Sequence, residues 1–308
     1  MSASLAALAP IFFLIALGYA LRRIGVPGEG FWAGAEKLTY YMLFPALLLH
    51  SLAAASLGGI AVLPAAAALT TGVVTIAVIT LAIRPWLNLD GPAFSSVFQG
   101  TIRFNTYVGI AAALALYGDQ GLTLTAIAIG VLVPVVNILS VAALAHFAAE
   151  RPQGVARLIG AIAGNPLIIA CALGAGLNAG AIELPALIAD ILRFLGRASL
   201  PIGLLAVGAG LSLKAARQAG PAVVVTSALK LIALPLVTLA ACKLFGVSGL
   251  TAKVVLLFSA LPISASAFVL AGQMGGDKEL MAAALTLTTV LAAVTLPLIL
   301  ALAPALLP

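Results

Sequence analysis

Long apolar runs separated by short polar turns recur along the whole chain. Ten of these runs are long enough to cross a bilayer as helices, since about 20 apolar residues span its hydrocarbon core. Backbone polar groups in lipid must be hydrogen-bonded within the spanning segment, so the pattern predicts an all-α polytopic membrane protein. The runs are residues 5–22, 34–55, 60–83, 93–117, 121–148, 155–178, 186–211, 221–243, 250–273 and 279–303.

Composition supports this class. Of the 308 residues, 63% are hydrophobic and 8% are charged, against about 25% charged residues in a soluble domain. The net charge of +6 is scattered over short loops and forms no basic stripe, so the expected surroundings are membrane lipid and not nucleic acid. Cys171 and Cys242 lie inside apolar runs and are expected to pack as small apolar residues. Neither a metal nor a cofactor is predicted.

Residues of the second half echo those of the first at a constant offset. Pro10 recurs 156 positions later as Pro166, and Pro45 recurs at the same offset as Pro201. A register held over a half-chain indicates an internal repeat of five helices. Because five is odd, two copies must face opposite ways through the membrane, which predicts an inverted repeat.

The two predicted repeats are residues 1–150 and 151–308. With the loops numbered alternately, nine lysines and arginines lie in the loops of one side and four in the loops of the other. Because cytoplasmic loops carry the excess of basic residues, this distribution predicts that both termini lie outside the cytoplasm.

Two of the runs contain candidate helix breaks, one in each repeat. The fourth run holds "RFNTYVG" (103–109), and the ninth holds "SALPISASAF" (259–268), in which Pro262 removes a backbone donor. A half-helix that begins at mid-membrane presents unpaired N–H groups and a positive dipole end, which together favour an anion. The side chains expected to bind an anion at these breaks are those of Asn105, Thr106, Ser264 and Ser266.

The ionisable residues indicate the charge of the ligand. All nine acidic residues lie in loops or near predicted helix ends, whereas Arg103 and Lys230 lie near the middle of runs. A cation pathway would be expected to place carboxylates at depth, so this core favours an anion. Two roles stay open for Arg103, as a cap on helix carbonyls or as a ligand contact. Lys230 is expected to snorkel or to pair with carbonyls, and Asn137 to bond between helices or to the substrate.

Three segments resemble the auxin efflux carrier family, the bacterial relatives of the plant PIN carriers. They are "KLTYYMLFPALLL" in the second run, "RFNTYVGI" in the fourth and "LPISASAFVLAGQMGGD" in the ninth. The resemblance covers essentially the full length. It implies a secondary carrier in the bacterial inner membrane that moves small organic anions, such as malate, malonate or auxin-like carboxylates, by an elevator motion.

The resemblance also implies roles for particular parts of the chain. In that family, helices matching runs 1, 2, 6 and 7 form a scaffold that also makes a homodimer. Helices matching runs 3–5 and 8–10 form the moving transport part, in which the fourth and ninth helices cross at their breaks. Asn105 matches the crossover asparagine and Pro262 the crossover proline.

This chain departs from the family pattern in two places. Gly109 is followed by "IAAAL" where the family often has a proline, and only "HFAAERPQGVAR" (146–157) joins the halves, without the long hydrophilic loop of many plant members. The nearest alternatives are a cation/proton antiporter and a sodium-coupled anion symporter of similar fold. An enzyme is not predicted, because the sequence shows no paired acid, His-Asp arrangement or metal-ligand spacing. Direction and coupling ion stay open.

Overall fold

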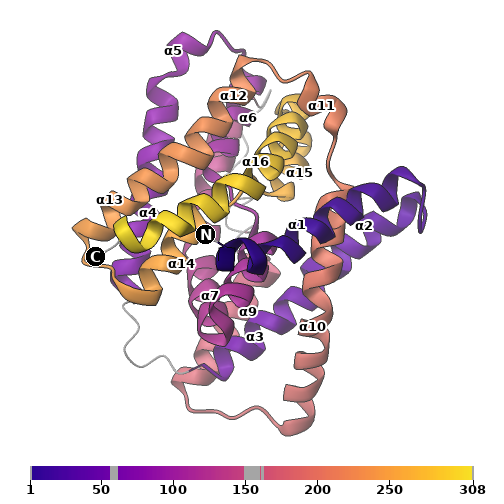
Figure 1. Cartoon of the computed structure of the whole chain (residues 1–308), viewed down its shortest axis with the longest axis vertical. Coiled ribbons are helices and arrows are strands. Elements are labelled where there is room, and N and C mark those ends of the chain that lie inside the picture. Colours follow the sequence, from indigo (N-terminus) through magenta and orange to yellow (C-terminus); the bar gives the residue numbers. More distant parts are fainter. Residues whose placement is uncertain (1, 56–61, 149–159, 161–162, 307–308) are drawn as a thin grey trace.

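The computed structural model of the chain describes residues 2–55, 62–148, 160 and 163–306, and their regular structure is helical (Figure 1). The all-α class predicted from the sequence is therefore confirmed. The first half contains α1 (Ser2–Arg23), α2 (Glu29–Leu38), the π-helical turn η1 (Thr39–Leu43), α3 (Phe44–Ala53), α4 (Val62–Ala82), α5 (Arg84–Leu87), α6 (Gly91–Ile102) and α7 (Thr106–Phe147). The second half contains α9 (Pro166–Ala179), α10 (Ala186–Ala209), α11 (Leu213–Arg217), α12 (Pro221–Ala228), the π-helical turn η2 (Leu229–Ala233), α13 (Leu234–Leu244), α14 (Gly249–Ser259), α15 (Ala265–Gln273) and α16 (Lys278–Leu306).

Six helical stretches in the described residues are long and apolar enough to cross a membrane, so the chain is an integral membrane protein. Their number is lower than the ten predicted runs because some runs are subdivided and one stretch holds two of them. The stretch 91–147 contains the fourth and fifth runs, whereas a break divides the ninth run into α14 and α15. The six stretches are Leu5–Arg23, Val62–Ala82, Gly91–Phe147, Ala186–Ala209, Pro221–Leu244 and Lys278–Ala303.

Large apolar side chains are exposed over much of the molecular surface. In water such a surface would promote association, but in a bilayer it is the face that meets lipid chains. The pattern is the one expected of helices that are apolar nearly all round. Examples from α1, α4, α5, α10 and α16 are Phe13, Leu63, Trp86, Leu187, Phe194 and Val294.

Two helices contain a π-helical turn next to a proline. The turn η1 precedes Pro45, and η2 precedes Pro235. A proline ring clashes with the carbonyl one turn earlier and offers no N–H, so a wider turn accommodates it without ending the helix. The two helices therefore continue through their prolines as α2–η1–α3 and α12–η2–α13.

The breaks predicted in the fourth and ninth runs are present and lie against each other. The first separates α6 from α7, and the second separates α14 from α15. The backbone N–H of Asn105 donates to the carbonyl oxygen of Pro262 at 2.8 Å, which joins the two breaks directly. The N–H of Ile263 donates in turn to Thr288 Oγ1 of α16 at 3.3 Å, so backbone groups freed by the second break find partners.

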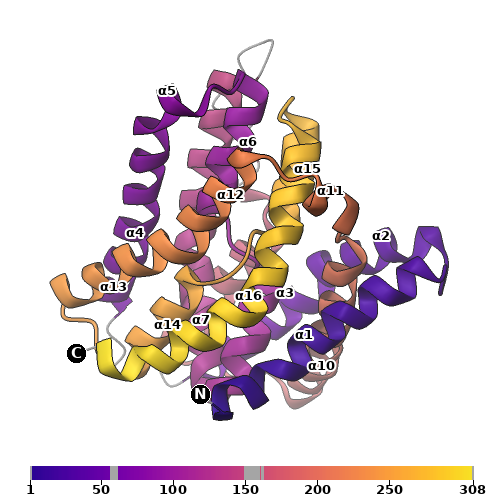
Figure 2. The same cartoon turned by 45° about the horizontal axis from the view of Figure 1, so that its top comes forward.

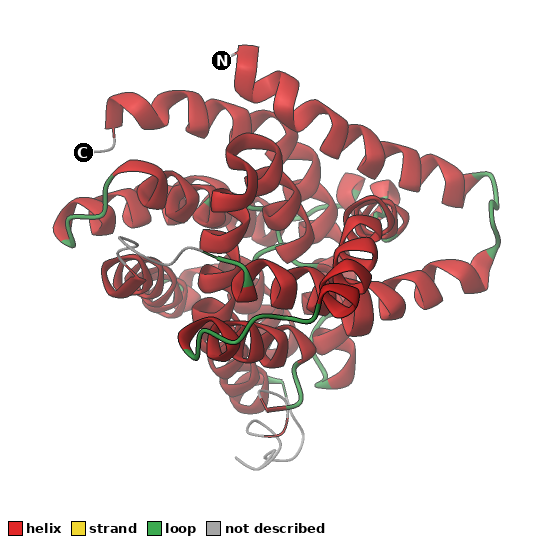
Figure 3. Ribbon diagram, turned by 90° about the horizontal axis from the view of Figure 1, so that it is seen from below, coloured by secondary structure: helices red, strands yellow, loops and turns green. Residues whose placement is uncertain are grey.

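The helices pack in two groups, and both breaks belong to the second of them (Figures 1 and 2). In one group α1 packs against α10, α10 against α3, and α3 against α9. In the other α4 packs against α13, α6 against α7, and α16 against α12 and α15. The two chain ends lie on the same side of the molecule in Figure 3. The boundary predicted between residues 150 and 151, and the basic residues Arg151 and Arg157, lie outside the described residues.

Candidate functional site

A cavity of about 620 Å³ lies where the two helix breaks face α2, the middle of α7 and the start of α9. Its lining contains every side chain that the sequence predicts to bind an anion. Pro262 is not in the lining, and its carbonyl oxygen accepts from the Asn105 N–H. The predicted residues that line the cavity are Arg103, Asn105, Thr106, Asn137, Ser264 and Ser266.

Arg103 lies at the end of α6 and bridges two other helices. Its Nη1 donates to Asn137 Oδ1 of α7, and its Nη2 donates to Ser266 Oγ of α15, both at 2.9 Å. The side chain is 8% exposed, and its Nε has no partner in the described residues. Of the two roles that the sequence left open, these contacts support the one facing the cavity, because the guanidinium bonds to side chains and not to helix carbonyls.

The charge of Arg103 has no protein counter-charge in the part of the chain that the structure describes. The ion pair found there joins Arg193 to Asp190, near the start of α10. Buried cations in proteins are normally paired, because an unpaired charge in a low-dielectric interior is costly. A bound anion would supply the missing partner.

Asn105 caps the N-terminus of α7 and keeps one donor free. Its Oδ1 accepts from the N–H groups of Tyr107 and Val108 at 3.1 and 3.2 Å, as an N-cap residue does. Its Nδ2 has no partner in the described residues, although the residue is only 2% exposed. The side chain thus offers an unpaired donor at the positive end of a helix.

Two serines continue the polar network on the other break. Ser264 caps α15 by accepting from the Ser266 N–H at 3.3 Å, and the two hydroxyl oxygens are 2.8 Å apart. Because Ser266 also accepts from Arg103, one chain of hydrogen bonds runs from Asn137 through the guanidinium to Ser264. The hydroxyl protons can reorient toward a ligand without moving the helices.

Sequence reasoning missed several polar residues of the cavity, Glu36 and Asn165 among them. Glu36 is half-buried and lines it, because α2 begins at Glu29, before the predicted start at residue 34, and runs beside the breaks. Asn165 also lines it, because the apolar run 155–178 does not continue as one helix and α9 begins at Pro166. An asparagine directly before a proline is a helix-start signal, so the position of Asn165 could have been predicted from the sequence.

The expectation for Lys230 is wrong. It neither snorkels to the surface nor pairs with a carbonyl, since it is 0% exposed and its Nζ has no partner in the described residues. The reason is its place in η2, which packs against α6 and α16 inside the second group of helices. Lys230 does not line the cavity.

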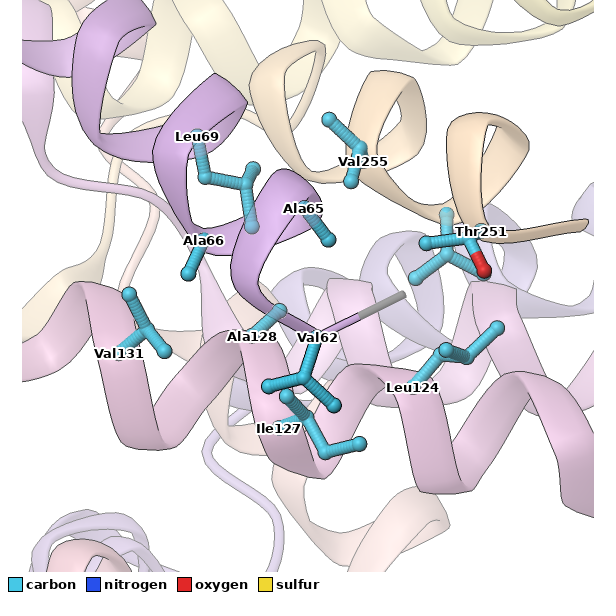
Figure 4. Close-up of a pocket in the computed structure, with 11 residues that line it drawn as sticks. Val62, Ala65, Ala66, Leu69, Leu124, Ile127, Ala128, Val131, Thr251 and Val255 are labelled. Carbon is cyan, nitrogen blue, oxygen red and sulfur yellow. The ribbon is translucent and has the colours of Figure 1, made fainter. Parts of the chain in front are cut away.

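A second, much smaller pocket between α4, α7 and α14 is apolar, unlike the cavity at the helix breaks (Figure 4). Its volume is about 10 Å³, and its lining is aliphatic except for the hydroxyl of Thr251. Such a pocket has neither the room nor the donors that an anion requires.

Comparison with known proteins relates the chain to membrane transporters. Residues 155–300, which include α9, α14 and α15, match the model of a family described as membrane transport protein. The chain is also 25% identical over 301 residues to an uncharacterized transporter from Methanothermobacter thermautotrophicus, and the match covers 94% of each chain.

Proposed function

We propose that this chain is a membrane transport protein of the auxin efflux carrier family and that it is a secondary carrier of small organic anions. The observation that carries the proposal is the buried guanidinium of Arg103, which has no carboxylate partner in the described residues. Asn105 adds an unpaired amide donor in the same cavity. Mono- and dicarboxylates, malate-like, malonate-like or auxin-like, suit these donors and this charge.

The proposed mechanism is an elevator motion of two inverted five-helix repeats. The scaffold comprises α1–α3, α9 and α10, and the transport part comprises α4–α7 and α12–α16. Two observations support this division: the helices pack mainly within these groups, and the cavity lies at their boundary. The hydrogen bond from the Asn105 N–H to the Pro262 carbonyl would keep the crossed breaks together while the transport part moves.

The proposed setting is the bacterial inner membrane, with both termini outside the cytoplasm. A homodimer through the scaffold helices is part of the proposal, and the exposed apolar side chains of α10, such as Leu187 and Phe194, would be available for it. Efflux of an anion from a negative-inside cell is downhill by roughly 2.3 kcal/mol per charge per 100 mV. Transport driven by the membrane potential therefore requires no coupling ion.

A carrier coupled to protons or sodium is the alternative, and Glu36 is the observation that favours it. This carboxylate lines the same cavity as Arg103 without forming an ion pair in the described residues. A carboxylate beside an anion site repels the ligand when ionised and tolerates it when protonated. Protonation of Glu36 would then accompany anion binding, which couples the two as proton symport.

Thermal unfolding of the detergent-purified protein tests the proposal. The panel is malate, malonate, acetate and indole-3-acetate, each with and without sodium. A bound anion at 100 times its Kd stabilises the folded state by about 2.7 kcal/mol, so the Tm should rise. Asn105→Asp keeps the oxygen that caps α7 but removes the amide donor and adds a negative charge, so this variant should lose the rise.

Thr251→Val, at the apolar pocket, is the matched control and should respond to the panel as the wild type does. A wild type whose Tm changes with sodium or pH but with none of the carboxylates would replace the proposal by the cation-coupled alternative.

A further inference from the structure

A third helix begins at the cavity, in addition to α7 and α15. The α9 helix starts after Asn165, whose Oδ1 accepts from the N–H groups of Leu167 and Ile168 at 3.0 and 3.3 Å. Asn105 caps α7 with the same pattern, by accepting from the second and third residues after it. In both cases the oxygen is used by the cap, and the amide nitrogen is the donor that the side chain can offer to a ligand.

Asn165 is a buried residue at the cavity wall. It is 7% exposed, and the lining also includes its neighbours Gly164, Pro166 and Leu167. The α9 helix has 14 residues, long enough for its positive dipole end to favour an anion at this wall.

Two other residues of the cavity are an independent reason to expect an anion there. Arg103 Nε and Asn105 Nδ2 are donors without partners in the described residues, and both side chains are more than nine-tenths buried. Both residues line the cavity that Asn165 lines. The start of α9 therefore faces a space in which buried donors already lack an acceptor.

The wall that carries Asn165 packs most extensively against α3, in a different group of helices from Arg103, and it also contacts α7. Asn178, near the end of α9, donates from Nδ2 to the carbonyl oxygens of Ala53 and Ala55 at 3.2 and 2.6 Å. Gly174 lies so close to the Leu49 carbonyl of α3 that a side chain there would clash. These contacts hold α9 against α3, whereas Arg103 and Asn105 belong to α6 and α7.

We propose that Asn165, with the N-terminus of α9, forms the second wall of the anion site and donates a hydrogen bond from Nδ2 to the transported carboxylate. This inference rests on the proposed function and names a residue that determines affinity within it. The anion is then held between the two helix groups, by Arg103 and Asn105 from one and by Asn165 from the other. Its affinity depends on both walls being in place.

The test compares the Kd of malate, malonate and indole-3-acetate for the wild type, Asn165→Ser and Asn165→Asp by calorimetric titration. Serine keeps an oxygen for the cap and removes the amide, so the Kd should rise about 10-fold or more, the effect of losing a hydrogen bond to a charged group. Aspartate keeps the cap with a charge that repels the ligand, and should abolish binding. The Tm without ligand should stay close to that of the wild type for both variants, which distinguishes a ligand contact from a structural one.

Ser212→Ala is the control, because it removes the cap of α11, away from the cavity, and should leave every Kd unchanged. If the wild type binds a carboxylate and both Asn165 variants keep its Kd within twofold, this inference is wrong and the proposed function stands. If the wild type binds none of the three, the proposed function fails and this inference fails with it.

Discussion

Arg103 donates from both terminal nitrogens to neutral side chains, those of Asn137 and Ser266. This arrangement positions the guanidinium but does not neutralise it, and no carboxylate in the described residues does so. The sequence alone located the charge near the middle of an apolar run. It did not indicate which side chains would hold it, because both partners lie on other helices, 34 and 163 positions along the chain.

Two replacements of Arg103 should distinguish what its charge contributes to anion affinity from what its hydrogen-bonding geometry contributes. Arg103→Gln removes the charge, and the Kd for the stabilising carboxylate should rise about 30-fold or more, since loss of one partner of a buried charge pair costs about 2–5 kcal/mol. Arg103→Lys keeps the charge but cannot reach two acceptors in fork geometry, so it should show an intermediate loss. Titration calorimetry measures both, and unchanged affinity in Arg103→Gln would exclude Arg103 from the site.

The parts of the site that could be predicted from the sequence are helix ends that carry a local sequence signal. Pro262 and the segment before Thr106 break their helices through local chemistry, a missing donor and a capping asparagine, and both breaks were predicted. The start of α9 has the same kind of local signal in Asn165 and Pro166. It was missed because the apolar run continues across it. Glu36 carries no such signal, since its place at the cavity depends on how α2 packs.

Gly118 gives a prediction for one such helix end. It separates the two parts of α7 with φ 60° and ψ −151°, a conformation that is essentially restricted to glycine. Gly118→Ala should therefore destabilise the protein by about 1–3 kcal/mol. Gly34→Ala is the matched control, because Gly34 lies within α2 with open space around it, and alanine there should be neutral or stabilising. Denaturation in detergent compares the two, and equal Tm values would contradict the strain at Gly118.

The described part of the chain forms two groups of helices (Figure 2). A polar cavity lies where the two groups meet. Within the first group, Gly18 of α1 and Gly208 of α10 leave no room for a side chain against the facing backbones of Leu205 and Ile15, so these helices are in close contact. The all-α class followed from the apolar runs because the bilayer leaves few alternatives. The contacts between helices did not, because apolar surfaces carry little information on which pairs form.

The most direct measurement is exchange of a radiolabelled carboxylate, malate, malonate or indole-3-acetate, into proteoliposomes that hold the same unlabelled anion. Uptake is expected with the wild type and with Thr251→Val. With Asn105→Asp, in which the cap of α7 remains and the donor at the break is gone, uptake should be no faster than in protein-free liposomes. Uptake by Asn105→Asp at the wild-type rate would contradict the claim that the anion passes through this cavity.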